Sequence, residues 1–248
     1  MNKDFSSSQI VINQLEGYKS DDKASIFSSF FKTGKGEYGE GDEFAGITVP
    51  EIRAVAKKYR DLDLSEVQKL LESKIHEYRL CGLLILTYKF PTLNEIEKLE
   101  IVNFYLTNIK HINNWDLVDL SAYKILGEYL LNHDDLMNKI RKMALSKCIW
   151  SRRIAMVSMF ELIKNGKFKE PFEIIEILIN DPHDLIHKAV GWMLREIGKR
   201  DELKLTKFLD THAKSMPRTA LRYAIEKLND DQRLYYLQLK KKSLESIL

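Results

Sequence analysis

The sequence lacks any long apolar run, because no stretch approaches the roughly 18 consecutive apolar residues that a membrane-spanning helix needs. Its start, MNKDFSSSQI, lacks the basic and then apolar order of a secretory signal. Cysteine is scarce: Cys81 and Cys148 stand alone in apolar surroundings, which predicts two buried thiols rather than a metal or redox pair. These absences predict a soluble, cytoplasmic protein with no membrane partner.

The sequence also offers no convincing β-strand, since no block of alternating Val, Ile and Thr lies between turn residues. Low-complexity runs are absent, and 44% hydrophobic residues supply ample material for a core. Apolar residues recur instead at spacings of three and four, which is typical of helices. Capping boxes are predicted at residues 48–51 and 92–95. The sequence therefore predicts an all-α fold.

Five segments of similar pattern indicate an internal repeat. They are EYRLCGLLIL, LVDLSAYKIL, SRRIAMVSMF, IHKAVGWMLR and MPRTALRYAI. Aligning them on Arg79, Asp119, Arg153, His187 and Arg218 gives spacings of 40, 34, 34 and 31 residues, the period of helical-pair repeats. Two places after each anchor stands a small residue, which lets neighbouring helices approach. We expect a superhelical solenoid in which the five anchors line one concave groove.

The chain is predicted to form a single repeat domain over residues 1–248, with the repeat array at 47–248 and an atypical N-terminal cap at 1–46. Residues 33–46 carry five of the 11 glycines and are expected to form an exposed loop. Gly34, Gly36 and Gly39 match the spacing of a dinucleotide fingerprint, but no strand precedes them and no helix start follows. We therefore predict no nucleotide site.

Charge is distributed unevenly along the chain. Residues 1–138 contain 16 Lys and Arg against 22 Asp and Glu, giving −6, whereas residues 139–248 contain 23 against 14, giving +9. Residues 139–170 are the most basic, with nine Lys and Arg against Glu161 and Glu170. This polarity favours a polyanionic partner for the second half, held in a basic groove. The alternative is that these cations lie on solvated helix faces.

Asp119 is the one acidic anchor in a largely basic row, and Trp115 precedes it by one helical turn, so ring and carboxylate share a face. A carboxylate in a basic groove would be held ionised and could stabilise a developing cation. Alternatively, Asp119 is an ion-pair partner of Arg153. Trp192 lies near the groove of a later repeat, and Trp150 is expected to pack at its helix start.

A zinc site is a further alternative. His183 and His187 are one turn apart, as in a zinc-binding H-E-x-x-H helix, but Asp184 replaces the Glu and no third ligand follows. The simpler interpretation is that His183 and Asp184 occupy the exposed first turn of a helix after Pro182. We predict no metal.

Three motifs in order, N-N-W-D-L-V-D (113–119), I-W-S-R-R (149–153) and K-A-V-G-W-M-L-R-E (188–196), resemble the AlkD-like DNA alkylation repair glycosylases. The similarity includes G-I-T-V-P-E-I-R (46–53). The resemblance implies an array of HEAT-like repeats that holds duplex DNA in a basic concave groove. We predict no cofactor, and we expect a monomer, because a solenoid that wraps DNA can act alone. The resemblance also implies hydrolysis of the N-glycosidic bond of cationic alkylpurines such as 3-methyladenine and 7-methylguanine, reached from the backbone side without a pocket for a flipped base.

The resemblance assigns roles to individual residues. Trp115 and Trp192 match the aromatic residues that flank the deoxyribose of the lesion, Asp119 the catalytic carboxylate, and Arg153 a phosphate-contacting arginine. Further phosphate contacts are expected from Arg152, Lys188, Arg195 and Arg218. The rival hypothesis is a non-enzymatic HEAT-repeat scaffold for a protein or nucleic acid. The joint presence of the two tryptophans, Asp119 and Arg153 favours catalysis, since a scaffold needs none of them.

Overall fold

The computed structural model describes residues 7–239 and is built of helices. Within this range the one β contact is an isolated bridge between Glu43 and Ile75, so the predicted all-α fold is confirmed. None of the helices in the described range is both long and apolar enough to cross a membrane. Contacts divide the chain into two compact units, Met1–Ile125 and Leu126–Leu248. Each unit is described by itself.

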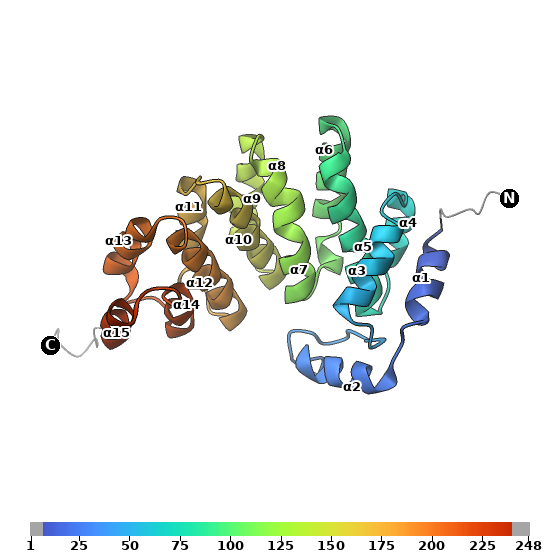
Figure 1. The fold of residues 1–248 in the computed structure, drawn as a ribbon, viewed down its shortest axis with the longest axis horizontal. Coiled ribbons are helices and arrows are strands. Elements are labelled where there is room, and N and C mark those ends of the chain that lie inside the picture. Colours follow the sequence, from blue (N-terminus) through green and yellow to red (C-terminus); the bar gives the residue numbers. More distant parts are fainter. Residues whose placement is uncertain (1–6, 240–248) are drawn as a thin grey trace. The chain divides into compact units, whose positions relative to one another are not determined.

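The N-terminal unit packs its helices around α5, which contacts α3, α4 and α7 (Figure 1). Twelve of the 14 residues of α5 are buried, which makes it the centre of this unit. The helices are α1 (Ser8–Glu16), α2 (Asp21–Phe30), α3 (Val49–Lys58), α4 (Leu64–Leu71), α5 (His76–Lys89), α6 (Glu95–Thr107) and α7 (Trp115–Ala122).

The C-terminal unit packs around α10 and α12, which contact each other; α10 also contacts α9 and α11, and α12 contacts α13 and α14. A π-helical turn, Tyr123–Gly127, leads from α7 into α8. The helices are α8 (Glu128–Leu130), α9 (Met137–Ala144), α10 (Ile149–Lys164), α11 (Lys169–Leu178), α12 (Asp184–Gly198), α13 (Glu202–His212), α14 (Arg218–Ala224) and α15 (Asp230–Gln238).

The predicted repeat is confirmed in its helices and in its small residues. The five aligned segments fall on α5, on α7 with its π-turn, and on α10, α12 and α14. The small residue of each segment is 0% exposed, so a larger side chain there would push packed helices apart. These residues are Cys81, Ser121, Ala155, Ala189 and Ala220.

Helix starts follow the capping chemistry, with one change of register. The box at residues 48–51 is confirmed, because the Thr48 amide donates to Glu51 Oε2 at 2.7 Å. The second box lies two residues later than predicted: Asn94 is the cap, and its amide donates to Glu97 Oε2 at 3.0 Å. Thr92 cannot serve, because it belongs to the 3₁₀ turn Phe90–Thr92.

The interpretation of residues 33–46 as an exposed loop is wrong for its second half. Asp42 and Ala45 are 8% and 1% exposed, and the Glu43 backbone pairs with that of Lys74 and His76 just before and at the start of α5. Gly46 has φ +77°, and a Cβ atom there would meet the Ser20 carbonyl. Only glycine therefore fits where the loop passes the start of α2.

The expectation of two buried thiols is half correct. Cys81 is buried in α5, whereas Cys148 is exposed at the cap of α10. Burial raises the pKa of the Cys81 thiol, which keeps it neutral. Trp150, in the first turn of α10, is 7% exposed, so it packs at its helix start as predicted.

Candidate active site

Helix α7 begins at a buried asparagine that fixes the two predicted catalytic side chains of the N-terminal unit. Asn114 is 0% exposed, and its Oδ1 accepts a hydrogen bond from the Trp115 amide at 2.8 Å. Trp115 is thus the first residue of α7, and Asp119 follows one turn later on the same face. Both line one cavity of about 530 Å³. The structure therefore brings the ring and the carboxylate together, as the spacing predicts.

The other walls of this cavity come from α2, α3, α5 and the loop after α2, and we call it the aromatic pocket. Its lining is aromatic and aliphatic apart from four side chains, His76, Glu77, Asp116 and Asp119. The aromatic lining residues are Phe27, Phe30, Phe31, Phe44 and Trp115.

The rings of the aromatic pocket form a continuous stack. Trp115 lies on Phe31 with centroids 5.2 Å apart and an interplanar angle of 27°. Phe31 stacks on Phe44 at 5.1 Å, and Phe44 stacks on the His76 imidazole at 4.6 Å. Phe30 meets Trp115 edge-on at 5.9 Å. Such contacts add stability beyond the area they bury, so they hold Trp115 in one orientation.

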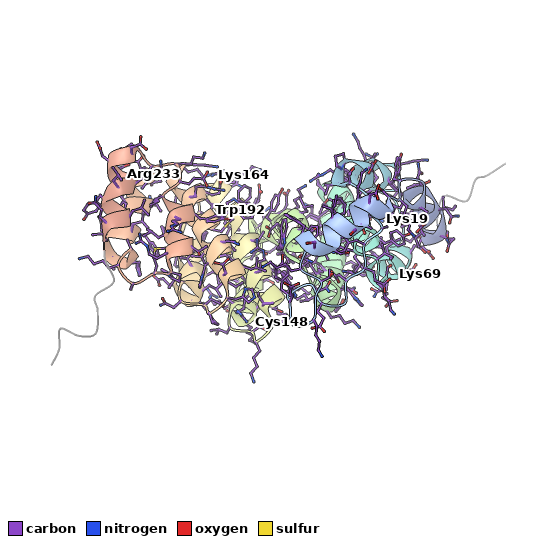
Figure 2. The ribbon with its side chains drawn as sticks, turned by 90° about the horizontal axis from the view of Figure 1, so that it is seen from below. Lys19, Lys69, Cys148, Lys164, Trp192 and Arg233 are labelled. Atoms are coloured by element: carbon purple, nitrogen blue, oxygen red, sulfur yellow. The ribbon has the colours of Figure 1, made fainter. Side chains whose placement is uncertain are left out.

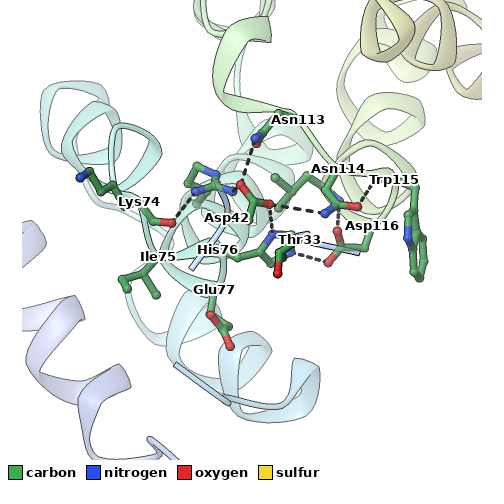
Figure 3. A network of polar contacts seen from close by, with 12 residues as sticks. Thr33, Asp42, Lys74, Ile75, His76, Glu77, Asn113, Asn114, Trp115 and Asp116 are labelled. Atoms are coloured by element: carbon green, nitrogen blue, oxygen red, sulfur yellow. Dashed lines mark hydrogen bonds and ion pairs between the residues drawn. The ribbon is translucent and has the colours of Figure 1, made fainter. Parts of the chain in front are cut away.

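Next to the rings lies a buried charge network of Asp42, His76, Arg79 and Asp116. Figure 3 shows Asp42, His76 and Asp116 within it. His76 joins the two carboxylates, with Nδ1 3.1 Å from Asp42 Oδ2 and Nε2 2.8 Å from Asp116 Oδ2. Arg79 Nη2 donates to Asp42 Oδ1 at 2.7 Å. The network ties the loop after α2 to the first turn of α7, where Trp115 lies.

His76 is charged at neutral pH. Burial disfavours the imidazolium, but the charge and hydrogen bond of Asp116 and the hydrogen bond of Asp42 outweigh it and raise the pKa of His76 to about 9. The pKa of Asp42 is lowered: burial opposes ionisation, but the His76 hydrogen bond and the Arg79 charge outweigh it. Two carboxylates thus face two cations, and the buried charges balance.

Glu77 fixes the loop that closes the pocket. This carboxylate is 2% exposed and accepts hydrogen bonds from the amides of Ala45, Gly46 and Ile47 at 3.0, 2.8 and 3.1 Å. Three amide donors compensate its burial. The chain from α2 to α3 is therefore held against α5 by this carboxylate as well as by the backbone bridge at Glu43.

The row of anchors proves to combine three helix positions, because Arg218 is the first residue of α14 and the other four anchors lie further into their helices. Arg79 and His187 are the fourth residues of their helices and bond to carbonyls of the preceding turn, Ser73 and Lys74 for the first and Asp181 for the second. In α10 that position is held by Arg152, whereas Arg153, like Asp119 in α7, is the fifth residue. Arg79 therefore does not project into a groove, because it is 4% exposed and caps its own repeat.

The predicted DNA-binding arginines of α10 are engaged inside the C-terminal unit. Arg153 is 5% exposed, and its guanidinium donates to the Leu185 carbonyl at the start of α12. Arg152 bonds to the Ser146 and Lys147 carbonyls at 3.0 and 2.9 Å and pairs with Asp181 at 2.6 Å. Both side chains thus hold α10 against neighbouring segments, and their role in phosphate binding stays a prediction.

The remaining predicted contacts also belong to this unit. Lys188 pairs with Asp184 at 2.9 Å, and Arg195 pairs with Glu226. Arg218 Nη2 donates to the Leu237 carbonyl at 2.7 Å. A phosphate bound by Lys188 or Arg195 would therefore replace an existing ion pair. Trp192, labelled in Figure 2, is half-buried in α12 and packs against Phe160 at 5.7 Å.

The two histidines of the zinc alternative serve as helix-start groups. His183 is the cap of α12 and its Nδ1 accepts from the Leu185 amide at 3.1 Å, while His187 bonds to the Asp181 carbonyl. Across residues 7–239, no group of three or more His, Cys, Asp and Glu side chains is arranged to hold a metal ion.

The sequence alone missed the aromatic pocket and the charge network. The sequence IFSSFF (26–31) places aromatic side chains on one side of a short helix, a signal that helical periodicity could have revealed. The charge network carried no local signal, because its members come from the loop, α5 and α7 and meet only in the folded unit.

Fold and site together define an all-α helical-repeat protein with a carboxylate and a tryptophan in one aromatic pocket. The family model for DNA alkylation repair enzymes matches residues 11–228, and the chain belongs to this family. A predicted DNA alkylation repair enzyme from Enterococcus faecalis shares the fold, with a TM-score of 0.67, 20% identity, and coverage of 86% of this chain and 97% of that one. AlkD2 from Streptococcus mutans gives a TM-score of 0.53 at 19% identity, over 90% of this chain and 100% of that one. A search of the curated proteins finds no match.

Membership of the family indicates that the protein is an enzyme of DNA alkylation repair and that it binds DNA. The two solved structures are under 25% identical to the chain, so they support the helical-repeat fold alone.

Proposed function

We propose that this protein is a DNA glycosylase that releases positively charged N-alkylpurines from duplex DNA. The observation that carries the proposal is the shared pocket of Trp115 and Asp119, one helical turn apart at the fixed start of α7. A purine alkylated at N3 or N7 already carries a positive charge, so it leaves without a strong general acid. The remaining barrier is the cationic character that develops on the sugar.

Asp119 supplies the electrostatic part of the mechanism. As the bond between C1′ and the purine nitrogen breaks, its electron pair neutralises the base, and the sugar becomes an oxocarbenium ion. A carboxylate beside C1′ stabilises this cation and orients the attacking water, whose proton passes to the carboxylate or to solvent. The face of Trp115 adds attraction to the same positive charge. A role for Trp192 beside the sugar stays what the resemblance implies.

The test is base release from methylated duplex DNA, with 7-methylguanine and 3-methyladenine separated by chromatography. Asp119→Asn keeps the size of the side chain and removes its charge, so release should fall on the order of 10²-fold or more. Binding to methylated DNA should be unchanged. The matched control is Asp61→Asn in the same unit, since the Asp61 side chain is 90% exposed.

Two outcomes would overturn the proposal. Full activity of Asp119→Asn removes this carboxylate from the mechanism. A parent protein that binds methylated DNA but releases no base is instead the non-enzymatic scaffold.

A further inference from the structure

The residues just before Trp115 are bound by one buried carboxylate (Figure 3). Asp42 is 8% exposed and accepts hydrogen bonds from Asn113 Nδ2 at 3.0 Å and from Asn114 Nδ2 at 3.4 Å. Asn114 in turn caps α7, because its Oδ1 accepts a hydrogen bond from the Trp115 amide. Asp42 therefore sets where the backbone enters α7, although it belongs to the loop after α2.

The residue just after Trp115 is bound by His76. Asp116 is the second residue of α7, and its Oδ2 lies 2.8 Å from His76 Nε2. His76 also contacts the ring stack, because its imidazole lies on Phe44 at 4.6 Å. That stack continues through Phe31 to Trp115. The backbone and the ring of Trp115 are thus both connected to the same imidazole.

His76 must be protonated to donate both of its hydrogen bonds. Its Nδ1 lies 3.1 Å from Asp42 and its Nε2 2.8 Å from Asp116, and an ionised carboxylate can only accept. A neutral imidazole has one N–H, so it would turn a lone pair toward one of these carboxylates. Burial disfavours the charge, and Arg79 on the same helix opposes it, but the two carboxylates outweigh both and raise the pKa of His76 to about 9.

We infer that His76 is a positioning residue for base release: its imidazolium holds the start of α7, and with it Trp115 and Asp119, in the arrangement that acts on DNA. The inference rests on the proposed function. His76 acts through Asp116 and the ring stack rather than on the substrate. Its proton thereby becomes a condition for fast base release.

The first test is the pH dependence of base release from methylated duplex DNA, measured with protein in excess over DNA and with spontaneous release subtracted. The rate of the parent should fall as the pH rises through about 9, where His76 loses its proton. His76→Gln should release base about ten-fold more slowly at neutral pH and without that fall, while its affinity for DNA changes little. His133→Gln is the matched control, since His133 stacks on Tyr129 in the C-terminal unit.

Removing the charge of Asp116 as well should restore much of the lost rate. The double variant His76→Gln, Asp116→Asn is neutral at both positions, so Asp42 is balanced by Arg79. Two amides can also hydrogen-bond where the imidazolium and the carboxylate did. The double variant should be at least about three-fold faster than His76→Gln, whereas two independent losses of packing would add.

The orientation of Trp115 gives a readout that needs no activity. With 5-fluorotryptophan incorporated, Trp115, Trp150 and Trp192 give three fluorine signals, and Trp115→Phe assigns the first. That signal should broaden in His76→Gln, and in the parent as the pH rises through about 9, because the ring then populates more than one orientation. The titration of the parent needs no substitution, so it tests the inference even if His76→Gln fails to fold.

A parental rate and pH profile in His76→Gln overturn the inference, even if Asp119→Asn has abolished base release. A double variant no faster than His76→Gln also overturns it, since the loss then reflects packing. If the parent releases no base, the glycosylase proposal fails. A Trp115 signal that still broadens through about pH 9 then supports positioning by His76, and one that stays sharp overturns it.

Discussion

Removing the proton of His76 should weaken the N-terminal unit by an amount that the charge network sets. The pKa of His76 is about 9 in the folded protein against an ordinary value of 6.5. Because the folded value is the higher one, the stabilisation is fully present below about pH 6.5 and is lost as the pH rises through about 9. The difference of about 2.5 corresponds to about 3 kcal/mol, a large part of the stability of a small unit.

The assay is urea unfolding by circular dichroism at several pH values from about 6 to 10, with the parent and His76→Gln compared at each. Glutamine keeps a hydrogen-bonding side chain but cannot take up the charge that balances Asp42 and Asp116. The variant should be less stable by about 3 kcal/mol at the acidic end, and the gap should close toward the alkaline end. The pKa values of buried Cys81 and Tyr105 are also raised, so both proteins lose stability at the alkaline end through these groups. This loss is the same in the parent and in the variant, so it cancels in the difference between them.

His133→Gln serves as the control, because His133 stacks on Tyr129 in the C-terminal unit, outside the network. It should keep the pH dependence of the parent. A gap between the parent and His76→Gln that stays constant from about pH 6 to 10 would refute the reasoning, because His76 would then not titrate with a raised pKa.

Two further predictions concern the loop and the C-terminal unit. Gly46→Ala should lower the free energy of unfolding by more than about 1 kcal/mol, because φ is +77° and the new Cβ meets the Ser20 carbonyl. The thermal midpoint should fall with it, and an unchanged midpoint in differential scanning calorimetry contradicts the prediction. Arg153→Ala should weaken DNA binding and reduce the slope of log affinity against log salt by about one; an unchanged slope removes Arg153 from the phosphate contacts.

The sequence predicts the helices and their repeats well because both depend on local pattern. The small residues after each anchor are invisible to composition, yet aligned segments identify them, and all five prove fully buried. The register of the anchors is harder, because a shift of one residue decides whether a side chain caps its own repeat or bonds to the next one. Arg152 and Arg153 are adjacent arginines with the same propensities, and only the observed carbonyl partners tell them apart.

The candidate site is predictable only in part, for the same physical reason. Trp115 and Asp119 lie one turn apart on one helix, so their spacing fixes their common face. The rings that meet Trp115 in the pocket come from residues 27–31 and from Phe44, and nothing in their own sequence places them against α7. Three amides bound by Glu77 and one glycine at φ +77° hold that loop in place.

The balance of charges under the pocket bears on how Asp119 can act. Asp42 and Asp116 are paired with His76 and Arg79, and Glu77 accepts three backbone amides. In surroundings this apolar, an added carboxylate interacts more strongly with a nearby cation than it would in water. In the proposed mechanism that carboxylate is Asp119. Loss of the His76 proton would leave the network with two carboxylates against one cation. The pH that destabilises the unit should therefore also disturb the start of α7, where Trp115 and Asp119 are fixed.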